Sequence, residues 1–169
     1  MLVRLENGTE VLIRPVRPDD KTLLADGMEH LSRESVYQRF LAPKGPLSDT
    51  ELRYLTEVDF TDHVAYVAVR PEEPGVLVGV ARWVRLRDDP EVAEIAFVVS
   101  DALQRQGLGT VLAETLALAA RERGVRRFVA TMLPDNLGAH RLFARVAQER
   151  ETTSRGALHE VRGKIRPAA

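Results

Sequence analysis

Residues 98–110 read VVSDALQRQGLGT, and this stretch decides the fold class. The apolar run at residues 92–99 predicts a buried strand before it, and residues 107–123 place apolar side chains at helical spacing after it. The first amides of a helix have no partner within the helix and carry partial positive charge. Because Gly107 and Gly109 have no side chains, a ligand can approach these amides closely. The junction therefore predicts a cradle for an anion of the size of pyrophosphate.

Two other phosphate-binding loops do not match this stretch. The dinucleotide-binding fingerprint needs a third glycine three residues after Gly109, and Leu112 stands there. The P-loop needs Gly-Lys-Ser or Gly-Lys-Thr, whereas Gly109 is followed by Thr110 and Val111. A Gly-x-Gly pair alone is also compatible with a tight loop that precedes a helix and binds nothing.

Strands and helices are predicted on both sides of the junction. Strand-like runs lie at residues 9–16, 63–70, 76–86 and 92–99, and the short turns between the last three indicate an antiparallel meander. A further strand at 127–132 and a weak hairpin at 150–165 follow the junction. The positions expected to cap helices are Asp19 or Asp20, Ser32, Ser48, and Asp135 or Asn136, and Gly124 is expected to end the helix at 107–123.

These elements predict one domain over residues 1–169 with an α/β (α+β) fold. We expect a mixed, mainly antiparallel central sheet of about six to seven strands, flanked by helices. The chain has 169 residues and 0 cysteines, which excludes a disulfide framework, a Cys-ligated zinc site, an iron–sulfur cluster and a thiol nucleophile. The start is not a signal peptide and no stretch is apolar enough to span a bilayer, so we expect a cytoplasmic protein.

The net charge of -1 gives no reason to expect binding to nucleic acid or to a membrane surface. Its distribution is uneven, because residues 1–100 carry 12 basic and 18 acidic side chains, and residues 101–169 carry 12 and 7. An acidic first part suits a cationic substrate, and a basic second part suits a polyanionic ligand. Chance clustering of surface charges explains the same numbers.

Two motifs resemble those of a known family. The run Gln104-Arg105-Gln106-Gly107-Leu108-Gly109 is similar to the Gln/Arg-x-x-Gly-x-Gly/Ala motif of the GNAT N-acetyltransferase superfamily, and it lies between a strand and a long helix, as in that family. Asn136-Leu137-Gly138-Ala139 resembles the family's Asn-x-x-Ala/Ser element, which begins the next helix.

The first part of the chain resembles one branch of this superfamily, the GNAT domains of bacterial protein-lysine acetyltransferases that act on acyl-CoA synthetases. The similar stretches are NGTEVLIRPVRPDD, LSRESVYQRF, LTEVDFTDHVAYVAV and AEIAFVVSDALQRQGLG. In that branch the domain is often fused to a regulatory domain, and we expect no such domain within these 169 residues.

The resemblance implies acetyl-CoA, or a related acyl-CoA, as cosubstrate, and no metal. The main chain of the strand at 97–99 would pair with the pantetheine arm, next to a β-bulge that splays this strand from the strand at 127–132. The loop at 104–109 would hold the pyrophosphate, Arg105 would also meet a nucleotide phosphate, and Asn136 would bond the pantetheine from the opposite wall. The residues expected to bind the cosubstrate are Phe97, Val98, Val99, Gln104, Arg105, Gln106, Gly107, Leu108, Gly109, Thr110 and Asn136.

Acyl transfer to an amine needs a base, because a free lysine has a pKa of about 10.4. Glu94 is the one ionisable residue in the run at 92–99, and it aligns with the strand glutamate that serves as general base in several GNAT lysine acetyltransferases. The resemblance implies that Glu94 takes the proton of the amine, directly or through a water. A main-chain amide near Val98 or Val99 would stabilise the oxyanion. The alternative to a catalytic role is that Glu94 is simply a partly solvated residue at the start of a strand.

Two positions depart from the family. Many members carry a tyrosine seven residues after the asparagine as general acid for the thiolate, and here Phe143 stands there. Ala147-Gln148 replaces a Gly-Phe pair that often follows this helix. The thiol of CoA resembles that of cysteine, with a pKa of about 8.5, so it can leave as the thiolate without a proton donor. These departures leave two functions open, an acetyltransferase and a non-catalytic acyl-CoA-binding sensor or regulatory module.

We therefore expect an N-acetyltransferase that transfers the acetyl group of acetyl-CoA to a primary amine by direct attack. The acceptor is either a lysine of a protein, such as an acyl-CoA synthetase, or a small-molecule amine. The sequence does not decide between a monomer and a homodimer.

The remaining candidates are weaker. The four histidines are far apart and show no metal-binding spacing, and no Gly-x-Ser-x-Gly elbow of a serine hydrolase is present. His63 either lines the acceptor pocket or bonds to its loop neighbours Asp59 and Asp62. Tyr66 and Trp83 are expected either in the core or in the wall of the pocket. Tyr37 and Arg39 are expected either to take part in helix packing or to contact the substrate at the acceptor mouth.

Overall fold

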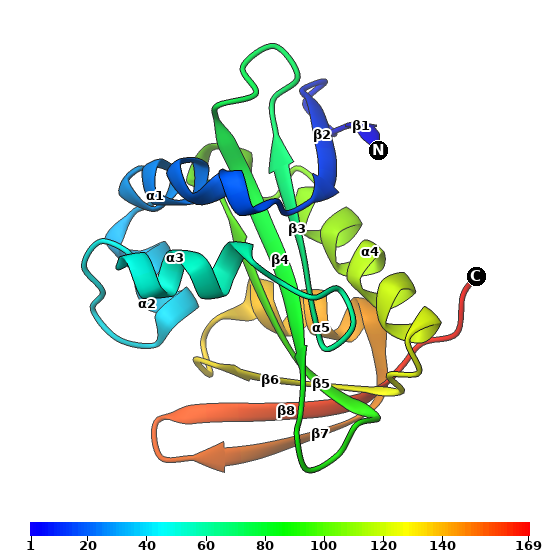
Figure 1. The fold of residues 1–169 in the computed structure, drawn as a ribbon. Coiled ribbons are helices and arrows are strands. Elements are labelled where there is room, and N and C mark those ends of the chain that lie inside the picture. Colours follow the sequence, from blue (N-terminus) through cyan, green and yellow to red (C-terminus); the bar gives the residue numbers. More distant parts are fainter.

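The computed structural model describes residues 1–169 and contains one sheet of eight strands in the order β1-β2-β3-β4-β5-β6-β8-β7 (Figure 1). The pair β5–β6 is parallel and all other neighbours are antiparallel, which confirms the predicted mixed, mainly antiparallel sheet. The sheet exceeds the expected six to seven strands because β1, with three residues, is too short to leave a sequence pattern. The strands are β1 Leu2–Arg4, β2 Glu10–Pro15, β3 His63–Val69, β4 Leu77–Arg85, β5 Val92–Val99, β6 Arg127–Met132, β7 Ala147–Arg155 and β8 Leu158–Ile165.

Helices cover both faces of this sheet (Figure 1). On one face lie α1 (Lys21–Glu29), α2 (Arg33–Phe40) and α3 (Asp49–Thr56), and on the other lie α4 (Leu108–Glu122) and α5 (Leu137–Val146). The helices predicted after Ser32, Ser48 and Asn136 are confirmed, because each of these side chains accepts a hydrogen bond from an amide in the first turn. None of the helices is both long enough and apolar enough to cross a membrane.

The predicted cap of the first helix is wrong. Asp20 directly precedes α1, but its carboxylate accepts no bond from that helix. It pairs instead with the Arg14 guanidinium through two bonds of 2.7 and 2.8 Å, and it accepts the amide of Arg17 at 2.7 Å. A buried carboxylate gains more from a bidentate charged partner than from one cap amide, which explains the exchange.

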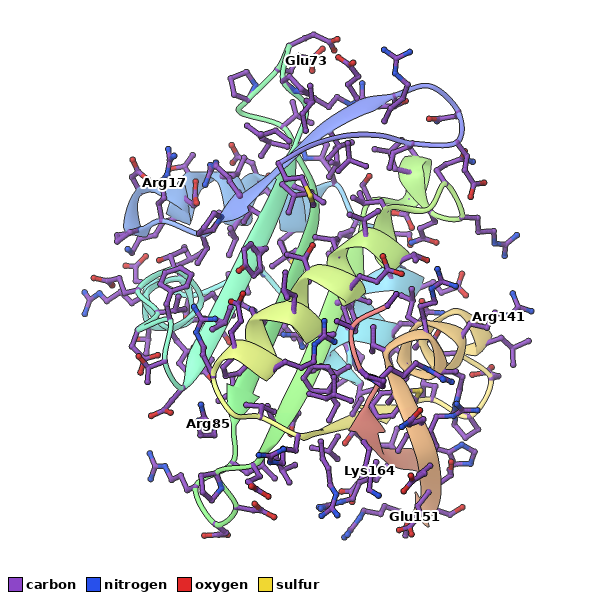
Figure 2. All side chains as sticks on the ribbon, turned by 90° about the vertical axis from the view of Figure 1, so that its right-hand side faces the viewer. Arg17, Glu73, Arg85, Arg141, Glu151 and Lys164 are labelled. Atoms are coloured by element: carbon purple, nitrogen blue, oxygen red, sulfur yellow. The ribbon has the colours of Figure 1, made fainter.

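The larger of two cores lies between the sheet and α4 (Figure 2). Leu108, Leu112 and Leu116 form the buried stripe of α4, and they belong to the same cluster as Trp83 and Phe128. Trp83 therefore belongs to this core, and Tyr66 packs against its border. A smaller core under α1 and α3 fills the opposite face.

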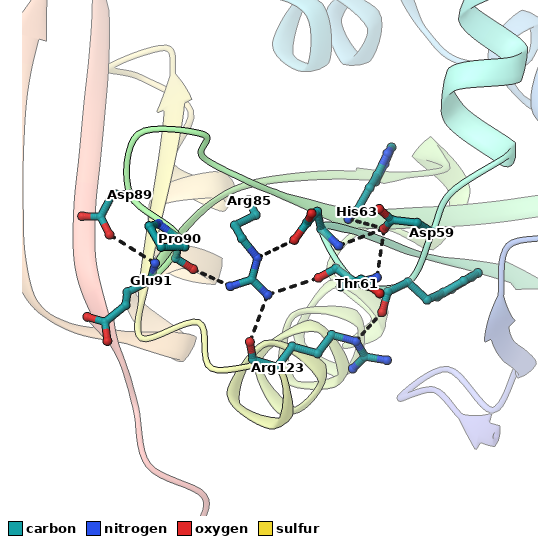
Figure 3. Close-up of polar contacts among 10 residues, drawn as sticks. Asp59, Thr61, His63, Arg85, Asp89, Pro90, Glu91 and Arg123 are labelled. Carbon is teal, nitrogen blue, oxygen red and sulfur yellow. Dashed lines mark hydrogen bonds and ion pairs between the residues drawn. The ribbon is translucent and has the colours of Figure 1, made fainter.

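A polar network fixes the loop that leads into β3 (Figure 3). The Asp59 carboxylate accepts the amides of Thr61, Asp62 and His63 at 2.8–2.9 Å. Arg85 donates to Asp62 and to the carbonyls of residues 61, 90 and 123, which ties this loop to the β4–β5 turn and to the end of α4. The network sets the position at which His63 enters the sheet.

Candidate functional site

The candidate site begins where β5 and β6 separate. Their pairing covers only Val92–Glu94 on β5 and Arg127–Val129 on β6, so residues 95–99 have no strand partner on that side. The predicted splay is thus present, but the predicted β-bulge is wrong, since the register between β5 and β4 is continuous from Ala93 to Val99. The two strands diverge because β6 turns toward β8 while β5 stays paired with β4.

The backbone of β5 alternates between its two neighbours. The amide of Ser100 donates to Val78 and the carbonyl of Val92 accepts from Leu86, both at 2.9 Å, so even-numbered residues of β5 face β4. Odd-numbered residues consequently direct their backbone groups into the opened side. Of the three residues expected to pair with pantetheine, Phe97 and Val99 have this orientation, whereas the backbone of Val98 faces Val80 on β4.

The loop between β5 and α4 presents free amides. None of the six consecutive amides of residues 105–110 donates a hydrogen bond to another protein atom. Arg105 and Gly107 have left-handed backbones, with φ of 61° and 90°, and such conformations curl successive amides into an anion-binding concavity. The expected residues Gln106, Leu108, Gly109 and Thr110 lie in this run, with the Leu108 side chain buried beneath it.

Gln104 has a different place from the one expected. Its side-chain Nε2 donates to the Val99 carbonyl and to Ser35 Oγ, both at 3.1 Å. The neighbouring Asp101 carboxylate accepts the amide and hydroxyl of Ser32 and the hydroxyl of Ser35. These bonds connect the amide loop to α2, so the Gln104 side chain positions the loop rather than pointing along its free amides.

The opposite wall is formed by the start of α5. Asn136 Oδ1 accepts the amide of Ala139 at 3.1 Å, which leaves its Nδ2 group without a protein acceptor. Leu142 of the same helix packs on α4, and a Cβ placed on Gly109 would lie 3.0 Å from it. Gly109 therefore also serves the contact between α4 and α5. Phe143 is buried in the main core, 1% exposed.

Glu94 lies at the last paired position before the strands diverge, and it is the one exposed residue of β5. Its side chain lies on the α1–α3 face of the sheet, where the register brings it beside Val84 and diagonal to Arg82. Burial lowers the pKa of Arg39 on α2, and the negative charge of Glu94 opposes this change. The carboxylate and two arginines thus share one side of the opened strand pair.

A cavity of about 80 Å³ lies between the helices α1–α3 and the strands β4 and β5, on the same face of the sheet as Glu94, which does not line it. Arg39 lines this cavity, which agrees with its predicted place at the acceptor mouth. Arg82 also lines it, and it was not predicted from the sequence as a site residue. The signal for Arg82 was its place as an ionisable residue inside the apolar run of β4. Tyr37 is exposed on α2 and does not line this cavity.

His63 supports the floor of this region without lining the cavity. Its Nε2 lies 2.9 Å from Arg82 Nη1, and its ring centroid lies 5.0 Å from that of Tyr54, with the two planes tilted by 43°. Burial and the neighbouring Arg82 guanidinium lower the pKa of His63 to about 4, although Asp59 opposes this. The imidazole is therefore neutral near pH 7 and accepts a hydrogen bond from Arg82. Of the other histidines, His140 and His159 lie 5.6 Å apart, and no three metal-ligating side chains converge anywhere in the structure.

Comparison with known proteins decides the family. Residues 31–147 match the Acetyltransferase (GNAT) family, which is more than half of the chain. The chain belongs to the GNAT family of acetyltransferases. GNAT acetyltransferases use acetyl-CoA as the acyl donor. The residues present fit this group, because the unbonded amides at 105–110 suit a pyrophosphate and the open edge of β5 suits an extended amide-bearing arm.

Similar GNAT proteins include two curated relatives and one solved structure. Acetyltransferase Pat of Mycolicibacterium smegmatis is 34% identical over 144 residues, which cover 85% of this chain and 43% of Pat. Acetyltransferase PA5475 of Pseudomonas aeruginosa is 31% identical over 124 residues, 73% of this chain and 66% of that protein. The chain thus spans less than two thirds of either relative. The crystal structure of the GNAT domain of S. lividans PAT superposes with a TM-score of 0.88 at 31% identity, covering 98% of this chain and 96% of that one.

Proposed function

We propose that this domain transfers the acetyl group of acetyl-CoA to a primary amine by direct attack, with Glu94 as general base. The observation that carries the proposal is the position of Glu94, exposed at the point where β5 and β6 diverge, with the free edge of β5 beginning at the next residue. Family membership and the relatives named acetyltransferase support the reaction class.

The chain offers each part of the cosubstrate a complementary surface. The amides of residues 105–110 would hold the pyrophosphate, and Arg105 would add a positive charge beside it. The backbone groups of Phe97 on the open edge of β5 would pair with the pantetheine arm from one wall, next to Val99, whose carbonyl already accepts from Gln104, and Asn136 Nδ2 would donate from the other. Acetyl-CoA supplies the activated acyl group, and the protein would supply the base and the donor that stabilises the oxyanion.

The amine must lose a proton to attack. A carboxylate within reach of the amine serves as base, and the exposed Glu94 can act directly or through a water. The amide of Val99 faces the opened side and suits the oxyanion, whereas the amide of Val98 is directed to β4. Phe143 has no acidic proton and is buried, so it would not protonate the thiolate. Because the thiol of CoA has a pKa of about 8.5, it leaves as the thiolate without an acid from the protein.

We infer that the acceptor is a primary amine, either a small molecule or a lysine of a protein such as an acyl-CoA synthetase. The resemblance of the first part of the chain to bacterial protein-lysine acetyltransferases supports the second, and the 34% identity to Acetyltransferase Pat agrees with it. The cavity lies on the same face of the sheet as Glu94, which supports an acceptor that enters from the α1–α3 side.

The test is release of free thiol from acetyl-CoA in the presence of an amine panel. We expect Glu94→Gln to lower turnover by about 10²- to 10⁴-fold, because it removes the base while keeping the size of the side chain. Binding of acetyl-CoA should be unchanged. Glu73→Gln is the matched control, since Glu73 is exposed and makes no ion pair, at the tip of the β3–β4 connection (Figure 2).

Two results would contradict the proposal. Full activity of Glu94→Gln would exclude Glu94 as the base. Tight binding of acetyl-CoA without thiol release, for every amine tested, would favour the sensor function over an enzyme.

A further inference from the structure

The cavity lined by Arg39 and Arg82 is basic, and no acidic residue lines it. Sixteen residues line it, ten of them hydrophobic, and the ionisable ones are His30, Arg39 and Arg82. The remaining polar lining is Ser100 and two glycines. Because the walls are otherwise apolar, the charges of the two arginines are poorly solvated by protein groups.

Arg82 is the more deeply placed of the two, with 5% of its surface exposed. Its Nη1 donates to the Leu55 carbonyl at 3.1 Å and to the neutral His63 at 2.9 Å. Neither partner carries a negative charge, and no carboxylate lies within 4.0 Å of the guanidinium. Nε and Nη2 have no partner in the protein.

Arg39 repeats this pattern. It makes no ion pair or hydrogen bond with another side chain, and its guanidinium lies 4.9 Å above the ring of Phe40. Burial, together with the charge of Arg39, lowers the pKa of Arg82 to about 10, so Arg82 is still cationic at neutral pH. Arg82 is a buried cation without a carboxylate partner, and the half-buried Arg39, which is influenced by the charge of Glu94, adds a second cation to the same cavity. An anion between the two guanidinium groups would lower the cost of burying these charges.

We propose that this cavity is a subsite for a carboxylate carried by one of the two reactants. The proposal rests on the proposed acetyltransferase function, because it places the carboxylate near the reacting centre. Arg82 lies opposite Ala96 on β5, two residues beyond Glu94, and Val98 of the same strand and Ser100 just after it line the cavity. A volume of about 80 Å³ accepts a carboxylate with a short carbon chain, since one water needs about 10–15 Å³.

The carboxylate has two sources that share this chemistry. It belongs either to the acceptor, as in an amino acid or another small amine with a nearby carboxyl group, or to the acyl group, as in a dicarboxylic thioester such as succinyl-CoA. In both cases the planar forks of Arg39 and Arg82 would bind the two oxygens, and Glu94 would remain free for the amine.

The subsite is tested by binding, without turnover. Succinate, and the uncharged succinamide as its control, are titrated into the isotope-labelled chain, and the amide signals of Val98 and Ser100 are followed. We expect succinate to bind saturably and succinamide to bind at least about tenfold more weakly. Arg39→Gln and Arg82→Lys should weaken succinate binding by at least about tenfold, while Arg53→Gln, an exposed arginine of α3 without an ion pair, should not.

Arg39 is half-buried, so Arg39→Gln keeps the test available if the Arg82 variant does not fold. Absence of saturable succinate binding, or equal affinity in the wild type and Arg39→Gln, would overturn the subsite. Succinate binding does not depend on Glu94. The test therefore distinguishes failure of the subsite from failure of Glu94 as the general base.

Turnover then identifies the source. Amines paired as carboxylate and amide are compared with acetyl-CoA as donor, and succinyl-CoA is compared with acetyl-CoA on an uncharged amine. Selectivity for the carboxylate amine assigns it to the acceptor, and selectivity for succinyl-CoA assigns it to the acyl group. Each selectivity should fall by at least about tenfold in Arg39→Gln. A chain that shows neither selectivity would contradict the proposal.

Discussion

The neutral His63 makes the stability of this protein depend on pH in a window that carboxylates do not share. His63 is 8% exposed at the start of β3, and burial together with Arg82 lowers its pKa from 6.5 to about 4. The facing charged or titratable groups are Arg82 on β4, Tyr54 on α3 and Asp59 in its own loop. A neutral imidazole is needed because only its neutral form accepts the bond from Arg82 Nη1.

The sign follows from the two pKa values. Between pH 6.5 and 4 the unfolded chain binds a proton at His63 that the folded chain excludes, so unfolding becomes easier as the pH falls. From pH 7.5 to 5.0 the loss amounts to about 2 kcal/mol of unfolding free energy. Carboxylates such as Asp59, whose pKa the amides of Thr61 and His63 hold below its ordinary 3.8, titrate below this window.

The assay is urea unfolding of the wild type and of His63→Gln at pH 7.5 and pH 5.0. Trp83 is the single tryptophan and is fully buried, so its fluorescence reports unfolding. Glutamine can still accept from Arg82 but does not titrate, and the variant should therefore lose about 2 kcal/mol less than the wild type over this interval. The other histidines are common to both proteins. Equal losses in the two proteins would refute the assignment of a neutral, buried His63.

Three further predictions follow from single positions. Gly107→Ala should cost about 1 kcal/mol in urea unfolding, because its φ of 90° disfavours a side chain, while Gly45→Ala should cost little. Phe143→Tyr should cost about 1–3 kcal/mol by burying a hydroxyl without a partner, and should not raise thiol release; a faster enzyme would show that this position reaches the thiolate. Asp101→Ala should lower thermal stability and weaken acetyl-CoA binding in a calorimetric titration, because it frees the amide loop from Ser32, which caps α2, and from Ser35 within α2; unchanged affinity would show that the loop needs no such anchor.

Much of the fold could be predicted because its signals are local. The caps at Ser32 and Ser48 and the apolar stripe of α4 each depend on residues a few positions apart, and all are confirmed. The cap at Asp20 was wrong because a partner on β2, Arg14, competes for the carboxylate. The bulge was wrong for a similar reason, since the course of β6 toward β8 opens the strands without one.

The same division holds for the candidate site. The amide loop is visible in the sequence by itself, because residues 104–110 are consecutive and their glycines leave the backbone accessible. The basic cavity is a product of tertiary structure. Arg39 and Arg82 come from a helix and a strand, and His63 supports Arg82 from a position 19 residues away. These groups come together through the register of β3, β4 and β5 and the packing of α2. Their spacing in the sequence does not predict that they lie close in space.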